Sequence, residues 1–176
     1  MMVVVVVMVI MNYSSFVFQD INTGRYLKIQ DTYEDRTNMN SLSIFEKVYD
    51  VTTSHIITSR EKFAITNSDS SDYPYYIQST HNNVYLTGMS SGTGGDVRGT
   101  GDVGNWQQIK IEKHNNNFVI SNVHGSFYDN GDKFMVDTNN TQKVMWRILV
   151  VDTILYDEVA NTSAIMNNIT SLTREG

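Results

Sequence analysis

The chain has 176 residues, no cysteine and a formal net charge of −6, from 13 basic and 19 acidic residues. This length fits one domain, and the lack of cysteine excludes a disulfide framework. Lys and Arg form no patch, which argues against nucleic acid and anionic membrane surfaces as partners. Only 18% of the residues are charged, whereas Asn, Ser, Thr and Tyr are plentiful, so the surface favours neutral hydrogen bonds and stacking.

Residues 1–15 begin with the apolar run MMVVVVVMVIM, which has no Lys or Arg before it. The run is too short for a transmembrane helix, and it lacks the basic start and small-residue cleavage site of a secretory signal. Its valines favour a buried strand, and a poorly formed signal or an aggregation-prone tail are the alternatives. We therefore interpret this segment as an apolar N-terminal strand or tail.

The absence of cysteine fits a reducing compartment, so we expect a cytoplasmic or nuclear protein, with secretion as the second alternative. Four asparagines lie in N-x-S/T triplets and would be glycosylation acceptors only in a secreted protein. They are Asn12, Asn139, Asn161 and Asn168.

One pattern occurs three times along the chain. It reads FVFQDINTGRYL at 16–27, YYIQSTHNNVYL at 75–86 and FVISNVHGSFYD at 118–129. In each copy a polar turn of Asn, His, Gly or Ser separates two short apolar runs, which predicts a β-hairpin. Three hairpins at intervals of tens of residues predict one unit repeated three times.

Further short strands are expected after each hairpin. They lie at 42–49, 54–59, 62–66, 106–112, 134–137 and 145–151. The glycine-rich segment 88–105 is interpreted as a loop, and it is not a P-loop because no G-K-[ST] follows. Hairpins cannot bury their apolar faces alone, but three units can close a barrel. We therefore predict an all-β fold, a β-trefoil of three pseudo-repeats over 16–151, with an irregular β-sandwich as the alternative.

Large aromatic residues recur at similar places in the units. Tyr26, Tyr85 and Tyr128 each fall eight residues after the third position of their hairpin, which predicts equivalent core positions. Trp106 and Trp146 open later strands and are also expected in the core. Residues 152–176 extend beyond three complete units and predict an extra strand or a linker tail.

Five segments, in order over residues 16–159, carry a family resemblance. FVFQDINTGRYL resembles the pattern aromatic-x-F-K-x-x-N-G-K-Y-L, and DVTTSHIIT (50–58) resembles D-P-T-x-x-H-E-x-F-T. YYIQSTHNNVYL, NWQQIKIEKHNNNFVISN (105–122) and WRILVVDTILYDEV (146–159) follow in the same order. These patterns are those of the amaranthin-type agglutinin domain, which the chain resembles over most of its length.

That resemblance implies a β-trefoil lectin without catalysis, cofactor or metal. Domains of this family bind galactose-type sugars, notably N-acetylgalactosamine and its disaccharide. They are often dimeric, with sugar near an interface, and many are fused to pore-forming modules. The implied partners are glycans or glycoproteins, and a homodimer or a fused second domain is expected, with no membrane insertion by this domain alone. The chain departs from the family at 88–105, where glycines replace a stretch rich in Trp, Tyr and Asn that contributes to the sugar site.

The candidate sugar-binding residues lie around the second unit. A neutral sugar site needs an aromatic face together with Asn, Asp or His side chains that fix the hydroxyls. The candidates are His81, Asn82, Asn83, Asp96, Arg98, Asp102 and Asn105. The alternative is a solvated loop with no ligand.

Other functions remain open in the sequence. An enzyme is not expected, because no G-x-S-x-G elbow accompanies the many serines, and a metal site is not expected without cysteine or an H-x-x-x-H pair. A trefoil-type protease inhibitor could use the loop at 31–41 or the glycine-rich loop as a substrate mimic. An interaction trefoil without a sugar site is the other alternative, although the acidic chain lacks the basic or His-rich surface typical of such modules.

Overall fold

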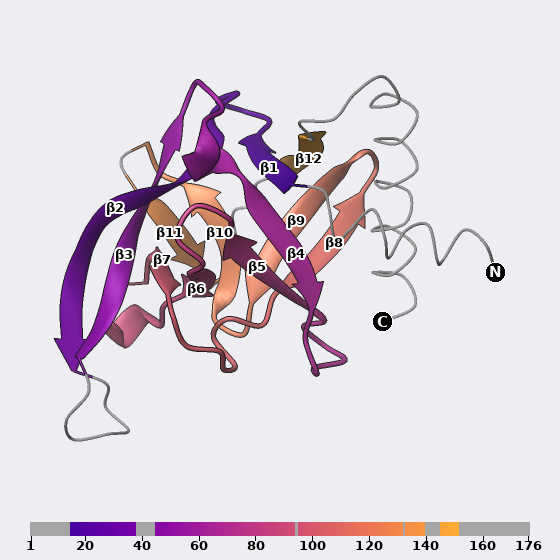
Figure 1. Cartoon of the computed structure of the whole chain (residues 1–176). Coiled ribbons are helices and arrows are strands. Elements are labelled where there is room, and N and C mark those ends of the chain that lie inside the picture. The colour runs from indigo at the N-terminus through magenta and orange to yellow at the C-terminus, as the bar shows by residue number, and fades with distance from the viewer. Residues whose placement is uncertain (1–14, 38–44, 94, 132, 140–144, 152–176) are drawn as a thin grey trace, which may run out of the picture.

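The computed structural model describes residues 15–37, 45–93, 95–131, 133–139 and 145–151 (Figure 1). The predictions for the N-terminal run before Ser15 and for the tail at 152–176 lie outside the described residues. Within these ranges the chain forms β-strands and two short 3-10 helices, η1 (Ser59–Glu61) and η2 (Ser91–Thr93). None of the helices in this part of the chain has the length and apolar character needed to cross a membrane.

The described chain contains twelve strands, so the all-β prediction is confirmed for this part. The strands are β1 (Ser15–Asp20), β2 (Tyr26–Thr37), β3 (Phe45–Ser54), β4 (Phe63–Asn67), β5 (Tyr75–Ser79), β6 (Tyr85–Gly88), β7 (Val97–Thr100), β8 (Lys110–His114), β9 (Asn117–Asn122), β10 (Gly125–Asp129), β11 (Phe134–Asp137) and β12 (Trp146–Val151).

Six of the strands pair side by side into a closed ring. β1 pairs with β12 and β4, β4 pairs with β5, and β9 pairs with β8 and β12. The ring closes between β5 and the residue before β8, where Tyr75 and Ile109 exchange backbone hydrogen bonds of 3.0 and 2.7 Å. A closed ring leaves no unpaired edge within the barrel.

The other six strands form three hairpins, β2–β3, β6–β7 and β10–β11. Each hairpin is paired to the barrel strand that precedes it, namely β1, β5 and β9. Every four consecutive strands therefore form one unit with two barrel strands and one hairpin, which is consistent with the predicted β-trefoil. The β2–β3 hairpin is the longest and extends away from the body of the molecule (Figure 1).

The core repeats with the units. Each unit contributes one cross-strand pair of apolar residues that are at most 1% exposed. The pairs are Phe16–Phe63, Tyr75–Ile109 and Phe118–Trp146. The same threefold relation places three buried residues at the start of the hairpins, namely Leu27, Leu86 and Phe127.

The prediction that three tyrosines are equivalent core residues is wrong. Tyr26 and Tyr85 are half-buried because successive residues of a strand point to opposite faces, and the next residue in each case enters the core. Tyr128 is also half-buried and is not their equivalent, because the turn between β9 and β10 is two residues shorter. Ser126 occupies the position of Tyr26 and Tyr85.

Three further predictions needed correction. Trp146 is buried as expected, but Trp106 is half-buried and lies in the turn before β8. The segment 54–59 does not form a strand of its own, because β3 ends at Ser54 and a turn leads into η1. The glycine-rich segment 88–105 contains β7 as well as loops, so two of its predicted site residues are held by a hairpin.

Candidate functional site

The structure divides the seven predicted sugar-site residues among three places. His81, Asn82 and Asn83 form the turn between β5 and β6, Asp96 and Arg98 are buried at β7, and Asp102 and Asn105 are exposed in the loop before β8. Their proximity in the sequence therefore does not produce one continuous pocket. Their role in sugar binding stays a prediction.

The side chain of His81 connects the second unit to the first. Its Nδ1 lies 3.1 Å from Ser59 Oγ, and its Nε2 lies 2.9 Å from Asp31 Oδ1. The hydrogen bond from His81 holds the pKa of Asp31 below its usual value, and Arg60 pairs with the same carboxylate. The order Ser–His–Asp resembles a catalytic triad, but Asp31 is 55% exposed and shared with an arginine. We interpret this cluster as a contact that joins two units.

Arg98 is the centre of a second group, the hairpin cluster, which consists of Glu34, Asp50, Asp96 and Arg98. Arg98 Nε lies 2.8 Å from Asp96 Oδ2, its Nη2 lies 3.0 Å from Glu34 Oε1, and its Nη1 pairs with Asp50. Burial opposes the positive charge, but Asp96 and the other two carboxylates outweigh it and raise the pKa of Arg98. The arginine therefore stays charged and joins β7 to the β2–β3 hairpin.

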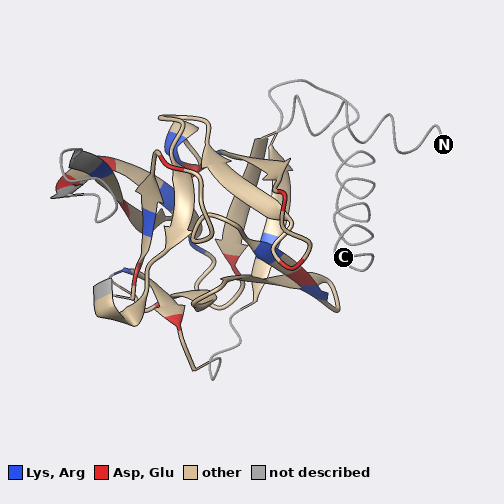
Figure 2. Ribbon diagram, turned by 90° about the horizontal axis from the view of Figure 1, so that it is seen from below, with Lys and Arg blue, Asp and Glu red and all other residues tan. Residues whose placement is uncertain are grey.

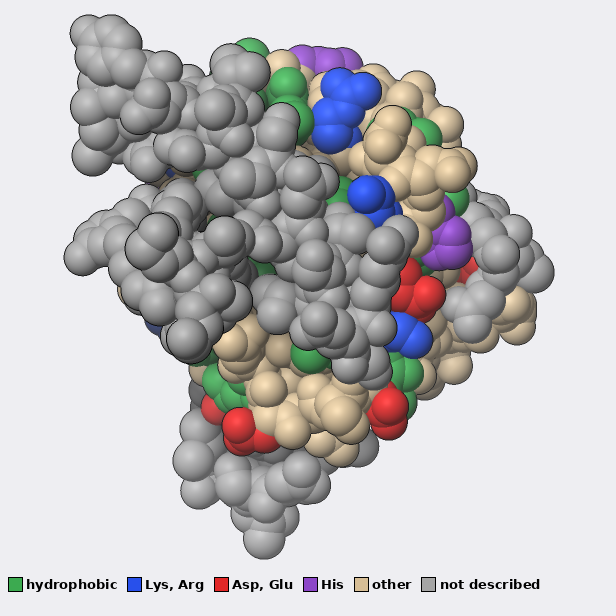
Figure 3. Space-filling view, turned by 90° about the vertical axis from the view of Figure 1, so that its right-hand side faces the viewer, with side chains coloured by type: hydrophobic (Ala, Val, Ile, Leu, Met, Phe, Trp, Pro, Cys, Tyr) green, Lys and Arg blue, Asp and Glu red, His purple; other side chains and the backbone are tan. Residues whose placement is uncertain are grey.

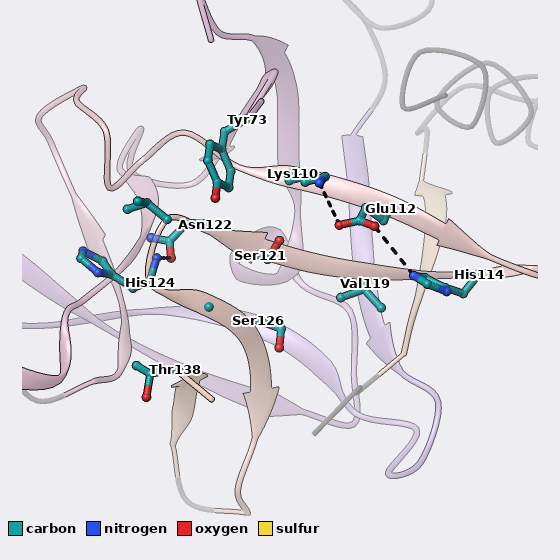
Figure 4. A pocket seen from close by; sticks show the side chains of 12 residues that line it. Tyr73, Lys110, Glu112, His114, Val119, Ser121, Asn122, His124, Ser126 and Thr138 are labelled. Atoms are coloured by element: carbon teal, nitrogen blue, oxygen red, sulfur yellow. Dashed lines mark hydrogen bonds and ion pairs between the residues drawn. The ribbon is translucent and has the colours of Figure 1, made fainter. Parts of the chain in front are cut away.

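A hollow of about 380 Å³ lies on the outer face of the third unit, between β8, β9 and β10 (Figure 4). We call it the third-unit hollow. Sequence reasoning did not identify it, because its lining comes from four segments that become neighbours only through strand pairing.

One wall of this hollow is a row of polar side chains on β8. Lys110, Glu112 and His114 alternate along the strand and therefore share a face. Lys110 Nζ lies 3.2 Å from Glu112 Oε1, and His114 Nε2 lies 4.0 Å from Glu112 Oε2 (Figure 4). All three side chains are 40–46% exposed, so they can reach a ligand from solution.

Small hydroxyl residues form the floor. Ser121 of β9 lies directly opposite Ser126 of β10, and Thr138 follows β11 at the same hollow. Ser126 is 5% exposed. In the described ranges none of these three hydroxyls forms a side-chain hydrogen bond, so each has donor and acceptor capacity for a bound molecule.

The back wall is held by Asn122. Its Nδ2 donates to the carbonyls of Gly88 and Trp106, both at 2.9 Å, and its Oδ1 accepts from the backbone N–H of His124 at 2.9 Å. A side chain at Gly88 would bring its Cβ within 2.4 Å of Asn122 Nδ2, so this close approach requires glycine. The wall is therefore fixed by contacts to the second unit.

His124 lies against this wall. Its ring packs edge-on against Trp106, with centroids 4.8 Å apart. Its Nε2 is buried and has no hydrogen-bond partner among the described residues. Burial lowers the pKa of His124, so the imidazole is neutral near pH 7.

Tyr73 provides an aromatic ring at the rim (Figure 4). Its backbone is held by two serines of the preceding loop, since Ser68 Oγ donates to the Tyr73 carbonyl at 2.5 Å and the Tyr73 N–H donates to Ser70 Oγ at 3.1 Å. Tyr73 is half-buried, so the residue is partly accessible at the hollow.

Charges of both signs are distributed over the molecule rather than separated. Basic and acidic residues are interspersed along the ribbon (Figure 2). The visible part of the right-hand side shows Lys or Arg, Asp or Glu and His side chains close together, with no patch of one sign (Figure 3).

Comparisons with known proteins identify a fold and no family. No family model matches the chain, and no curated protein matches it either. An endo-β-galactosidase from Clostridium perfringens that releases GlcNAcα1-4Gal superposes with a TM-score of 0.61 at 12% identity, over 79% of this chain and 33% of the enzyme. This chain thus spans a third of the length of that enzyme.

Two smaller proteins are covered almost completely. The β-trefoil BEL superposes with a TM-score of 0.57 at 16% identity, over 78% of this chain and 93% of BEL. SeviL, bound to the asialo-GM1 saccharide, superposes with a TM-score of 0.54 at 14% identity, over 81% of this chain and 99% of SeviL. At these identities the likeness establishes a shared fold and says nothing of shared residues.

Proposed function

We propose that the chain is a carbohydrate-binding module and that it binds sugar in the third-unit hollow, without catalysis. The hollow combines an aromatic ring, a carboxylate, an ammonium group and hydroxyls, which are the groups that stack on a sugar and fix its hydroxyls. The shared fold with SeviL, which binds the asialo-GM1 saccharide, supports this proposal.

The observation that carries the proposal is the unengaged hydroxyl floor. The hydroxyls of Ser121 and Ser126 line the hollow, and no described side chain bonds them. A sugar hydroxyl above them could exchange hydrogen bonds with both in place of water. Beside them His124 Nε2 is buried and has no hydrogen-bond partner among the described residues, and a buried group left without a partner costs about 1–3 kcal/mol.

We further propose galactose- or N-acetylgalactosamine-type glycans as ligands and a relation to the amaranthin-type agglutinins. The support for both is the ordered resemblance of residues 16–159 to that family. A homodimer or a fused second domain would raise avidity, because a shallow sugar site is weak alone and linked sites reinforce one another.

A glycan array with the intact protein tests the proposal. Binding to glycans with terminal galactose or N-acetylgalactosamine is expected, and free N-acetylgalactosamine should compete. A folded protein that binds no glycan would refute the proposal. The variant His81→Ala with Asn82→Ala is the matched control for the second-unit prediction, and we expect it to retain binding.

A further inference from the structure

The third unit differs from the other two at one equivalent position. At the base of the first hairpin Gln19 lies opposite Tyr26, and at the base of the second Gln78 lies opposite Tyr85. In the third unit the corresponding pair is Ser121 and Ser126. Paired residues of neighbouring antiparallel strands point to the same face, so each pair occupies the same place on the outside of its unit.

Large side chains fill this place in the first two units. Gln19 Nε2 donates to the Gly24 carbonyl at 3.0 Å, and Gln78 Nε2 donates to the Asn83 carbonyl at 2.9 Å. The ring of Tyr85 packs edge-on against Tyr76, with centroids 5.7 Å apart. Two serines cannot fill the same space, and the third-unit hollow is the result.

The neighbouring wall, on β8 at the end of the second unit, also differs from its equivalents beside the other two hairpins. Lys110, Glu112 and His114 lie one, three and five residues after Ile109, the second member of its buried pair. The same positions after Phe63 hold uncharged residues, and those after Trp146 form a largely apolar row on β12. The corresponding residues are Ala64, Thr66 and Ser68, and Arg147, Leu149 and Val151. Space and a row of polar side chains therefore coincide at one of the three equivalent places, the third-unit hollow.

We propose that Ser121 and Ser126 determine where sugar binds, so that the third unit binds one sugar residue and the equivalent faces of the other two units bind none. This inference rests on the proposed function. The hollow, at about 380 Å³, has the size of sites that hold small molecules, typically about 300–1,000 Å³. Through these faces one chain is monovalent, and cross-linking of glycans requires a second copy.

The first test fills the hollow with the side chains that the other units already carry. The variant S121Q with S126Y should bind N-acetylgalactosamine and the asialo-GM1 oligosaccharide at least about 100-fold more weakly in titration calorimetry, with an unchanged unfolding midpoint. The matched control is Q78S with Y85S, which makes the reverse change in the second unit and should retain one sugar per chain.

The second test uses the absence of cysteine from the chain. A single cysteine, S126C, should react with a methanethiosulfonate reagent, and saturating N-acetylgalactosamine or asialo-GM1 oligosaccharide should slow this labelling at least about tenfold. The matched variant Y85C should show no such protection. S126C changes one small side chain for another, so it decides the question even where the filled variant does not fold.

The outcomes separate this inference from the proposed function. One sugar per chain, with protection of S126C, supports both. Sugar binding that survives S121Q with S126Y, or that leaves S126C unprotected, overturns the inference and leaves the proposed function standing. A folded wild-type chain that binds neither the array glycans nor these two probes overturns both.

Discussion

A cavity beside the hairpin cluster and the third-unit hollow are both lined by polar residues. The contrast between them shows which property indicates a binding site. The cavity beside Arg98 measures about 230 Å³, but its arginine is 8% exposed and is engaged by three carboxylates. The hollow has fewer charges, yet its β8 side chains are exposed and its serine hydroxyls have no side-chain partner in the described chain. Polar side chains that are exposed to an incoming ligand, rather than the number of charges, indicate where a ligand can bind.

The largest expected effect comes from removal of Arg98. Arg98→Ala leaves the carboxylates of Asp50 and Asp96 close together without their counter-charge, so the free energy of unfolding should fall by about 3–5 kcal/mol. Urea denaturation measures this loss. Lys133→Ala, at an exposed residue of the same cavity, should change stability by less than about 0.5 kcal/mol.

This variant also tests the sequence-based site. If Arg98→Ala kept full stability and lost sugar affinity, the second-unit residues would be the binding site and the contrast between the two cavities would fail. If it lost stability while the residual folded protein still bound sugar, Arg98 would have a structural role.

Most of the fold could be predicted from the sequence because local patterns specify hairpins. The apolar runs around polar turns at 16–27 and 75–86 became β1–β2 and β5–β6, and their spacing indicated three units. The short segments after each hairpin were harder, since SHIITS resembles a strand but forms the turn before η1. There the buried carboxylate of Glu61 accepts from the Thr58 N–H and from Ser54 Oγ, both at 2.7 Å, and fixes the turn.

The site could not be predicted because it depends on register. A gap-free alignment of segment 118–129 with segment 75–86 placed Tyr128 opposite Tyr85 and concealed that Ser126 is the residue equivalent to Tyr85. The alignment becomes correct when the turn of segment 118–129 is made two residues shorter. The small residues that then occupy the paired positions were the only signal in the sequence. The contribution of Tyr73 had no local signal, since a loop brings it to β8 and β9 only in the folded chain.

Within the hollow, the carboxylate of Glu112 should have the largest effect on affinity. A hydrogen bond to a charged group contributes about 1.5–3 kcal/mol, so Glu112→Gln should weaken sugar binding about 10- to 150-fold. Stability should hardly change, because Glu112 is 43% exposed and exposed ion pairs contribute little. Titration calorimetry and thermal unfolding measure the two quantities.

The control makes the same chemical change at a residue of the sequence-predicted site. Asp102→Asn alters an exposed carboxylate among the sequence-predicted residues, and its affinity should equal that of the wild type. A loss at Asp102 without a loss at Glu112 would place the sugar outside the third-unit hollow.

Tyr73 should have a smaller effect. Stacking on an aromatic ring contributes about 0.5–1.5 kcal/mol, so Tyr73→Ala should weaken sugar binding about 2- to 12-fold. Tyr73→Phe keeps the ring and should retain nearly all of the affinity. Equal losses in both variants would assign the contact to the phenol hydroxyl instead of the ring.

The smallest effect is a pH dependence that links the wall of the hollow to stability. Burial holds the pKa of His124 below its ordinary value of 6.5, so the unfolded chain takes up this proton before the folded chain does. The contribution of His124 is therefore complete above about pH 6.5 and declines as the pH falls toward the folded-state pKa. Because the ring packs on Trp106 at the back wall, sugar affinity should decline over the same range.

His124→Gln should flatten the pH profiles of stability and of sugar affinity between pH 7.5 and 5. His114→Gln, at an exposed residue of the β8 wall, should keep the stability profile unchanged. A wild-type profile identical to that of His124→Gln would mean that the buried imidazole does not couple protonation to the hollow.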